Sequence, residues 1–79
     1  MDEAELQSAI LRLLARWEWL PETDLLRWLS PVEAVSYGPG TAQRLADAGL
    51  VEVREVGDER VLKLTERGRA AAQGAGQPL

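Results

Sequence analysis

Cysteine and histidine are both absent from this chain of 79 residues. Without cysteine no disulfide can hold the fold, and no thiolate is available for metal binding or redox chemistry. Without histidine, imidazole acid–base catalysis and the usual zinc ligand sets are excluded as well. No nucleotide-binding or catalytic motif occurs elsewhere in the sequence. We therefore expect no metal, no cofactor and no enzymatic activity.

Long hydrophobic runs are missing too, and the longest fall far short of the roughly 20 residues of a membrane span. The first residues, Met1-Asp2-Glu3, are acidic, whereas a signal peptide begins with basic residues. We expect a soluble, cytoplasmic protein that does not contact membranes. The chain is nevertheless 46% hydrophobic, which is enough for the core of one small domain. That domain is expected over residues 1–73, with a flexible tail over residues 74–79.

Negative charge is in excess, because 13 acidic side chains face 9 basic ones and leave a net charge of −4. Residues 1–39 hold seven acids and three arginines, a balance of −4, while residues 40–79 hold six of each sign. Basic side chains gathered on one face are typical of domains that bind nucleic acids. The second half of the chain is therefore the half in which such a face is expected.

Three helices are predicted from apolar spacing and from capping residues. The first covers residues 2–17, begins at a capping box of Asp2 and Glu5, and is followed by a short extended segment, residues 17–20. Pro21 opens the second helix, which runs to about Leu29. Ser30-Pro31-Val32-Glu33 is another capping box, for a short helical turn to about Ser36 that Gly38-Pro39-Gly40 ends. Thr41 caps the third helix, which closes at Gly49 and Leu50 in a Schellman motif.

A β-hairpin is predicted next, with Gly57-Asp58 as its two-residue turn. This register pairs Val53 with Leu62 and Val51 with Leu64 toward the core, and it pairs Glu52 with Lys63 and Glu55 with Arg60. Thr65 caps a final helix that ends near Gln73. The expected fold class is α+β, mostly α, with three helices, a two-stranded hairpin and a short C-terminal helix. The residues expected to be buried are Leu6, Ile10, Leu13, Leu14, Trp17, Leu25, Leu29, Leu45, Leu50, Val53, Leu62 and Leu64.

The stretch from Leu45 to Val51, the charged hairpin and the segment Leu64-Thr65-Glu66-Arg67-Gly68-Arg69 resemble the winged helix-turn-helix of MarR-like and PadR-like regulators. With residues 10–16 and 20–26 added, the chain resembles the replication-relaxation family of plasmid and mobile-element proteins. The resemblance implies a third helix in the major groove of DNA and a hairpin, the wing, on the DNA backbone or minor groove. The DNA-binding residues that it implies are Thr41, Gln43, Arg44, Arg54, Arg60 and Lys63.

Each of these side chains also has a purely structural interpretation. Arg44 and Gln43 are suited to reading guanine and adenine edges, but Arg44 has Asp47 three residues away as a possible ion-pair partner. Arg60 and Lys63 are suited to phosphates, but their cross-strand neighbours Glu55 and Glu52 offer ion pairs within the hairpin. Arg54 faces Val61 and has no acid opposite, so it is the better candidate for a phosphate contact.

Three tryptophans remain to be placed, and large aromatics at helical spacing usually belong to the core, although a platform for stacked bases is the alternative. Trp19, together with Leu20, is also a candidate for the seam of a homodimer. The nearby acids Glu18, Glu22 and Asp24 are interpreted as a solvated helix start.

The function expected is binding of double-stranded DNA, as a homodimeric winged-helix regulator of transcription or a module in plasmid replication. The alternative is a winged helix that binds a protein partner and no DNA. The net negative charge favours this alternative, and so do Asp58 and Glu59 at the tip of the hairpin.

Overall fold

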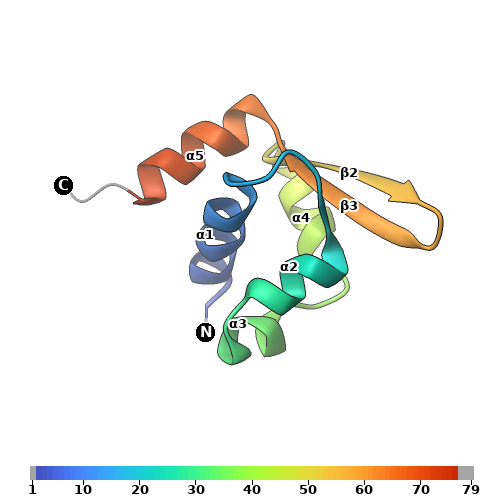
Figure 1. Cartoon of the computed structure of the whole chain (residues 1–79). Coiled ribbons are helices and arrows are strands. Elements are labelled where there is room, and N and C mark those ends of the chain that lie inside the picture. The colour runs from blue at the N-terminus through green and yellow to red at the C-terminus, as the bar shows by residue number, and fades with distance from the viewer. Residues whose placement is uncertain (1, 77–79) are drawn as a thin grey trace.

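Five helices and a three-stranded antiparallel sheet make up residues 2–76, the part of the chain that this computed structural model describes (Figure 1). The order is α1 (Glu3–Leu14), β1 (Leu20–Pro21), α2 (Glu22–Trp28), α3 (Pro31–Ser36), α4 (Thr41–Asp47), β2 (Val51–Val56), β3 (Glu59–Leu64) and α5 (Glu66–Gly76). The β2–β3 hairpin projects away from the helices, and α5 returns across α1. The expectation of a small α+β fold that is mostly helical is confirmed.

The helix starts follow the capping residues closely. The carboxylate of Asp2 accepts hydrogen bonds from the backbone N–H groups of Ala4 and Glu5 at 2.7 and 3.3 Å. At the start of α3 the capping box is complete, because Ser30 and Glu33 each accept a hydrogen bond from the other's backbone N–H. These bonds satisfy donors that have no partner within the first helical turn.

The end of α4 is the predicted Schellman motif. Gly49 has a φ of 76°, a conformation that glycine adopts without steric cost. Its N–H donates to the carbonyl of Ala46 at 2.9 Å, and the N–H of Leu50 donates to the carbonyl of Leu45 at 3.0 Å. The chain thereby turns directly from α4 into β2.

The hairpin has the predicted register throughout, with Val53 opposite Leu62 and Glu55 opposite Arg60. Gly57 lies in the turn at a φ of 64°. The sheet, however, has three strands and not two, because Leu20 and Pro21 form β1 and pair with Leu62 and Val61 of β3. Proline lacks the N–H of a central strand, and β1 is accordingly an edge strand.

The core is one cluster between the helices and the inner face of the sheet. Of the twelve residues expected to be buried, eight are: Leu6, Ile10, Leu14, Leu25, Leu29, Leu45, Leu62 and Leu64. Leu13, Leu50 and Val53 are half-buried and pack against this cluster. Other core members, not on that list, are Leu11, Leu20 and Val51.

Two tryptophans contradict the expectation of burial. Trp17 is 45% exposed and Trp28 is 60% exposed. The first helix ends at Leu14 instead of residue 17, so the helical spacing that directs Trp17 inward does not extend to it. Leu20 occupies the core there instead, at 4% exposure. In α2, Leu25 and the following Leu29 are the buried residues, and Trp28 faces outward.

The junction between β3 and α5 is tightly packed. Thr65 caps α5 as predicted, since its hydroxyl accepts from the N–H of Gly68 at 3.0 Å and donates to the carbonyl of Gly49 at 2.6 Å. A Cβ atom on Gly68 would lie only 1.9 Å from the carbonyl oxygen of Leu50. The helix continues to Gly76, three residues beyond its predicted end at Gln73. Residues 77–79 of the predicted tail lie outside the described residues.

Candidate nucleic-acid interface

The three α4 residues implied by the resemblance have different surroundings. Thr41 is the first helical residue and not the cap that the sequence predicts, and its complete burial does not fit the expected contact with DNA. Its hydroxyl accepts from the N–H of Gly38 at 2.9 Å and holds the preceding turn. Gln43 is exposed, and its amide donates to Asp47 at 2.9 Å.

Arg44 forms an ion pair with a residue that is far away in the sequence. Its guanidinium donates to both carboxylate oxygens of Glu3 at 2.7 and 3.3 Å, so that α4 is tied to the start of α1. The expected alternative, a pair with Asp47, is therefore wrong. Both side chains of the Arg44–Glu3 pair are about half exposed, at 53% and 48%, so the pair contributes little to stability.

Arg60 is part of a network that joins the hairpin to α2. Its guanidinium donates to the two carboxylate oxygens of Glu22 at 3.2 and 2.6 Å, and the hydroxyl of Tyr37 donates to the same carboxylate at 2.5 Å. Glu22 is thus a structural residue and not the solvated helix start expected from the sequence. Its side chain is only 19% exposed, compared with 32% for Arg60.

The titration of this network follows from its geometry. Burial by itself raises the pKa of Glu22, but the hydrogen bonds from Arg60 and Tyr37 outweigh it, and the net result is a pKa below the ordinary value of about 4.5. Burial and the adjacent Glu22 carboxylate raise the pKa of Tyr37 above its ordinary 10.0. The hydrogen bond to Glu22 also raises the pKa of Arg60. All three groups therefore hold their neutral-pH charge states.

The outer face of the sheet carries a cluster of basic and aromatic side chains, Trp19, Arg54 and Lys63. The guanidinium carbon of Arg54 lies 4.8 Å from the centroid of the Trp19 ring, and Nζ of Lys63 lies 5.5 Å from it. Both cations are within the range of a cation–π interaction. Lys63 also lies 3.7 Å from Glu18. Arg54 is exposed and forms no ion pair among the described residues.

The hairpin ion pairs expected from the register are replaced by longer-range ones. Lys63 is opposite Glu52 but pairs with Glu18, and Arg60 is opposite Glu55 but bonds Glu22. The reason is that residues 18–22 run along β3, and their carboxylates reach these cations from a neighbouring strand or helix. Thr23 of α2 also donates a hydrogen bond to Glu59, so one acid of the hairpin tip is engaged with α2.

Two features of this region are missed by the sequence interpretation. The sequence predicts Trp19 in the core or, with Leu20, in a dimer seam, but Leu20 is buried in its own domain and Trp19 lies beneath Arg54 and Lys63. For Trp19 the sequence does contain a signal, because successive side chains of a strand point to opposite faces of the sheet. Leu20 points inward beside Leu62, so Trp19 must point outward beside Lys63. The Glu22–Tyr37 contact has no comparable signal, since 15 residues separate the two.

Among residues 2–76, no helix combines the length and the hydrophobicity that crossing a membrane requires. The same part of the chain contains no group of three or more acidic side chains placed to hold a metal ion. Comparisons of the chain with protein-family models, with curated protein sequences and with solved structures give no match in any of the three.

Proposed function

We propose that the chain is a winged-helix domain that binds double-stranded DNA, with the β2–β3 hairpin as its wing. The proposal rests on one observation above all: Arg54 lies exposed on the outer face of the hairpin, held over Trp19, and no carboxylate of residues 2–76 pairs with it. A cation held in place by an aromatic ring keeps its donors free for phosphate oxygens.

The surroundings of the other candidate residues favour backbone contacts over base reading. Arg44 and Arg60 each donate two hydrogen bonds to a carboxylate, of Glu3 and Glu22 respectively. Lys63 lies 3.7 Å from Glu18, a looser contact on the outer face, so we count Arg54 and Lys63 as the cations left for phosphates. Gln43 is the exposed α4 side chain suited to a base edge. We therefore expect about two phosphate contacts per chain and little discrimination between sequences.

The test is fluorescence anisotropy with a labelled duplex of mixed sequence at several salt concentrations. With about two phosphates neutralised per chain, the slope of log K against log salt is expected near −2 per chain bound. Arg54→Ala is expected to weaken binding to all sequences and to reduce that slope by about one. Arg27→Ala removes the same charge and is the control, because Arg27 lies on α2, away from the wing, and faces Asp24 at 4.0 Å. Binding that is absent, or that is equal for Arg54→Ala and the wild type, contradicts the proposal.

A winged helix that binds a protein and no DNA is the second candidate. The observation that favours it is α3, where Val32 and Val35 are 63% and 87% exposed. Asp58→Asn separates the candidates, and it is preferable to a change at Glu59, which is bonded to Thr23. Removing this negative charge strengthens DNA binding if the wing approaches phosphates, because repulsion decreases. If the protein candidate is correct, neither the wild type nor the Asp58→Asn variant binds the duplex.

The homodimer expected from the sequence remains a prediction. Its seam does not include Leu20, which is buried within the domain. Sedimentation at high micromolar concentration tests self-association, and a single species of 8.7 kDa contradicts it.

A further inference from the structure

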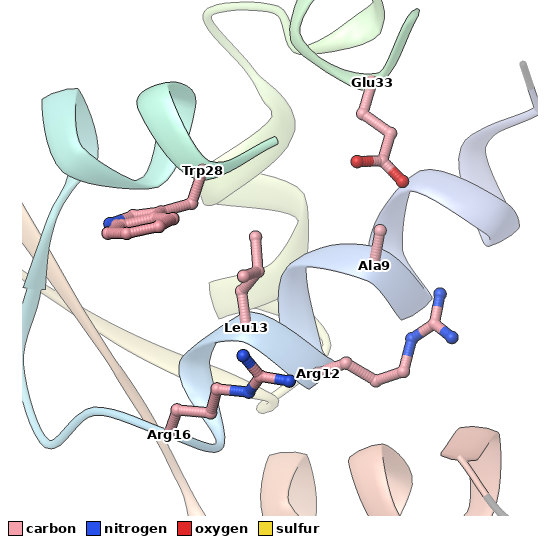
Figure 2. Close-up of a pocket in the computed structure, with 6 residues that line it drawn as sticks. All are labelled: Ala9, Arg12, Leu13, Arg16, Trp28 and Glu33. Atoms are coloured by element: carbon pink, nitrogen blue, oxygen red, sulfur yellow. The ribbon is translucent and has the colours of Figure 1, made fainter. Parts of the chain in front are cut away.

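A hollow of about 260 Å³ opens between α1 and the α2–α3 pair (Figure 2). Its walls are formed by Ala9, Arg12, Leu13, Arg16, Trp28 and Glu33. The volume is below the roughly 300–1,000 Å³ of sites for small molecules or cofactors. It is suited to one bulky side chain of another protein.

Three of the six residues that line the hollow are apolar: Ala9, Leu13 and Trp28. Figure 2 shows Leu13 pointing from α1 toward α2, with the indole of Trp28 beside it and Ala9 one turn away along α1. Trp28 is 60% exposed, although tryptophan is usually well buried. On the adjoining α3, Val32 and Val35 are also exposed, but neither of them lines the hollow. Exposed apolar surface with a polar rim marks interaction sites in soluble proteins.

The rim on the α1 side is positively charged. Arg12 and Arg16 are both exposed, and neither lies within ion-pair distance of a carboxylate in residues 2–76. Within the described part of the chain, the one hydrogen bond that Arg12 donates goes to the carbonyl of Ser8 in its own helix, at 3.4 Å. On the opposite wall, Glu33 is engaged in capping α3. Two positive charges against one negative leave the lining at +1, in a chain whose net charge is −4.

We propose that this hollow is the docking site for an acidic amphipathic helix of a partner protein. A bulky apolar side chain of that helix fits between Leu13 and Trp28, and carboxylates beside it meet Arg12 and Arg16. Arg12 lies in the last turn of α1 and Arg16 in the turn that follows it, so both flank the same side of the hollow. Acids one turn apart on the partner, about 6 Å along its axis, are placed to meet them. This is the helix-in-groove mode of recognition, with a charge pattern that determines the orientation.

The proposal goes beyond DNA binding, because it uses α1, α2 and α3 and none of the cations of the hairpin. A partner held there leaves Arg54 and Lys63 accessible. The two surfaces can therefore be tested separately, and failure of one proposal leaves the other intact.

The probe is a fluorescein-labelled helical peptide of about 15 residues, a length that can sustain a helix in water. It carries Phe and Leu one turn apart, with Glu residues beside them on the same face, and a matched peptide carries Lys in place of Glu. Anisotropy is measured with the full chain, and circular dichroism and thermal unfolding confirm that each variant is folded. Binding of the Glu peptide to the wild type, and none of the Lys peptide, is expected.

Three variants then distinguish docking from nonspecific attraction. Arg12→Gln/Arg16→Gln and Trp28→Ala are each expected to weaken binding of the Glu peptide about tenfold. Arg12→Glu/Arg16→Glu is expected to lose the Glu peptide and to bind the Lys peptide. Arg27→Gln, an exposed α2 residue outside the hollow, is the matched control and is expected to change affinity less than about twofold.

The proposal is overturned if the Glu peptide does not bind the wild type, or binds the Arg12→Gln/Arg16→Gln variant equally well. Equal binding of the Glu and Lys peptides to the wild type also overturns it, since the arginines then do not select the charge. Affinity for the DNA duplex, measured on the same variants, reports on the other surface.

Discussion

Arg54 and Arg60 lie on neighbouring strands of one hairpin, and the protein uses them differently. Arg60 shares the inner face with Leu62, and there it meets Glu22 at the start of α2. Arg54 is opposite Val61 on the outer face, where the aromatic ring of Trp19 is its neighbour. The alternation of side chains along a strand decides which face each arginine occupies. The inner face thus uses its arginine to attach the hairpin, and the outer face keeps its arginine accessible.

The largest effect of any single substitution is expected at Gly68, where α5 packs against the chain at the start of the hairpin. Gly68→Ala places a Cβ atom 1.9 Å from the carbonyl oxygen of Leu50. That carbonyl accepts from the N–H of Thr65, so it cannot move away without opening the junction between β3 and α5. We expect a loss of about 3 kcal/mol in the free energy of unfolding, measured in urea. Gly74→Ala in the same helix is the control, because nothing lies within 4 Å of its added Cβ. That variant is expected to gain up to about 1 kcal/mol from helix propensity. Equal losses at the two glycines contradict the close contact.

The two arginines are expected to separate stability from binding. Arg60→Ala removes the main hydrogen-bond partner of the Glu22 carboxylate. We expect the free energy of unfolding, measured in urea, to fall by about 1–2 kcal/mol. Arg54→Ala removes an exposed cation–π contact and is expected to cost no more than about 1 kcal/mol. The order is reversed for duplex affinity, where Arg54→Ala has the larger effect. If Arg60→Ala is the milder change in urea, the two faces do not divide their roles in this way.

A smaller effect is expected in the pH dependence of stability. The folded state lowers the pKa of Glu22, so its contribution is complete above the unfolded value of about 4.5 and is lost as the pH falls through the lower folded value. The folded state raises the pKa of Tyr37, so that contribution is present below 10.0 and is lost as the pH rises beyond it.

Thermal unfolding at acidic, neutral and alkaline pH measures both effects. Glu22→Gln is expected to reduce the loss of stability below about pH 4.5, and Tyr37→Phe to reduce the loss above about pH 10. Arg54→Ala serves as the comparison from the outer face and is expected to leave both slopes as in the wild type. Unchanged acid sensitivity in Glu22→Gln shows that other carboxylates dominate.

Much of the fold was predictable because its signals are local. The cap at Asp2, the capping box of Ser30 and Glu33, the turn at Gly57 and the Schellman ending at Gly49 each depend on residues within a few positions of one another. Alternating Val and Leu residues then left one hairpin register that buries the apolar side chains, and the structure has that register. The candidate site was less predictable, since the availability of a cation depends on the acids that approach it from elsewhere.

Thr41 and Trp28 show where local signals mislead. A threonine before an apolar segment is typical of an exposed cap, but the turn at Gly38 brings Thr41 into the core, where its hydroxyl bonds that turn. Trp28 fits the spacing of a buried helix face, but α2 is only seven residues long and Leu25 and Leu29 already fill the core beside it. In both cases the space left by other elements decided the outcome.

The sequence by itself therefore determined the positions of most helix and strand ends, the hairpin register and the identity of most core leucines, because short-range hydrogen bonds and apolar periodicity specify them. Only the tertiary structure decided which charges pair and which aromatics stay exposed. Ion pairs such as Arg44 with Glu3, 41 residues apart, form between elements that meet only after the chain has folded. The burial of a tryptophan likewise depends on the volume that the remaining elements leave in a small core.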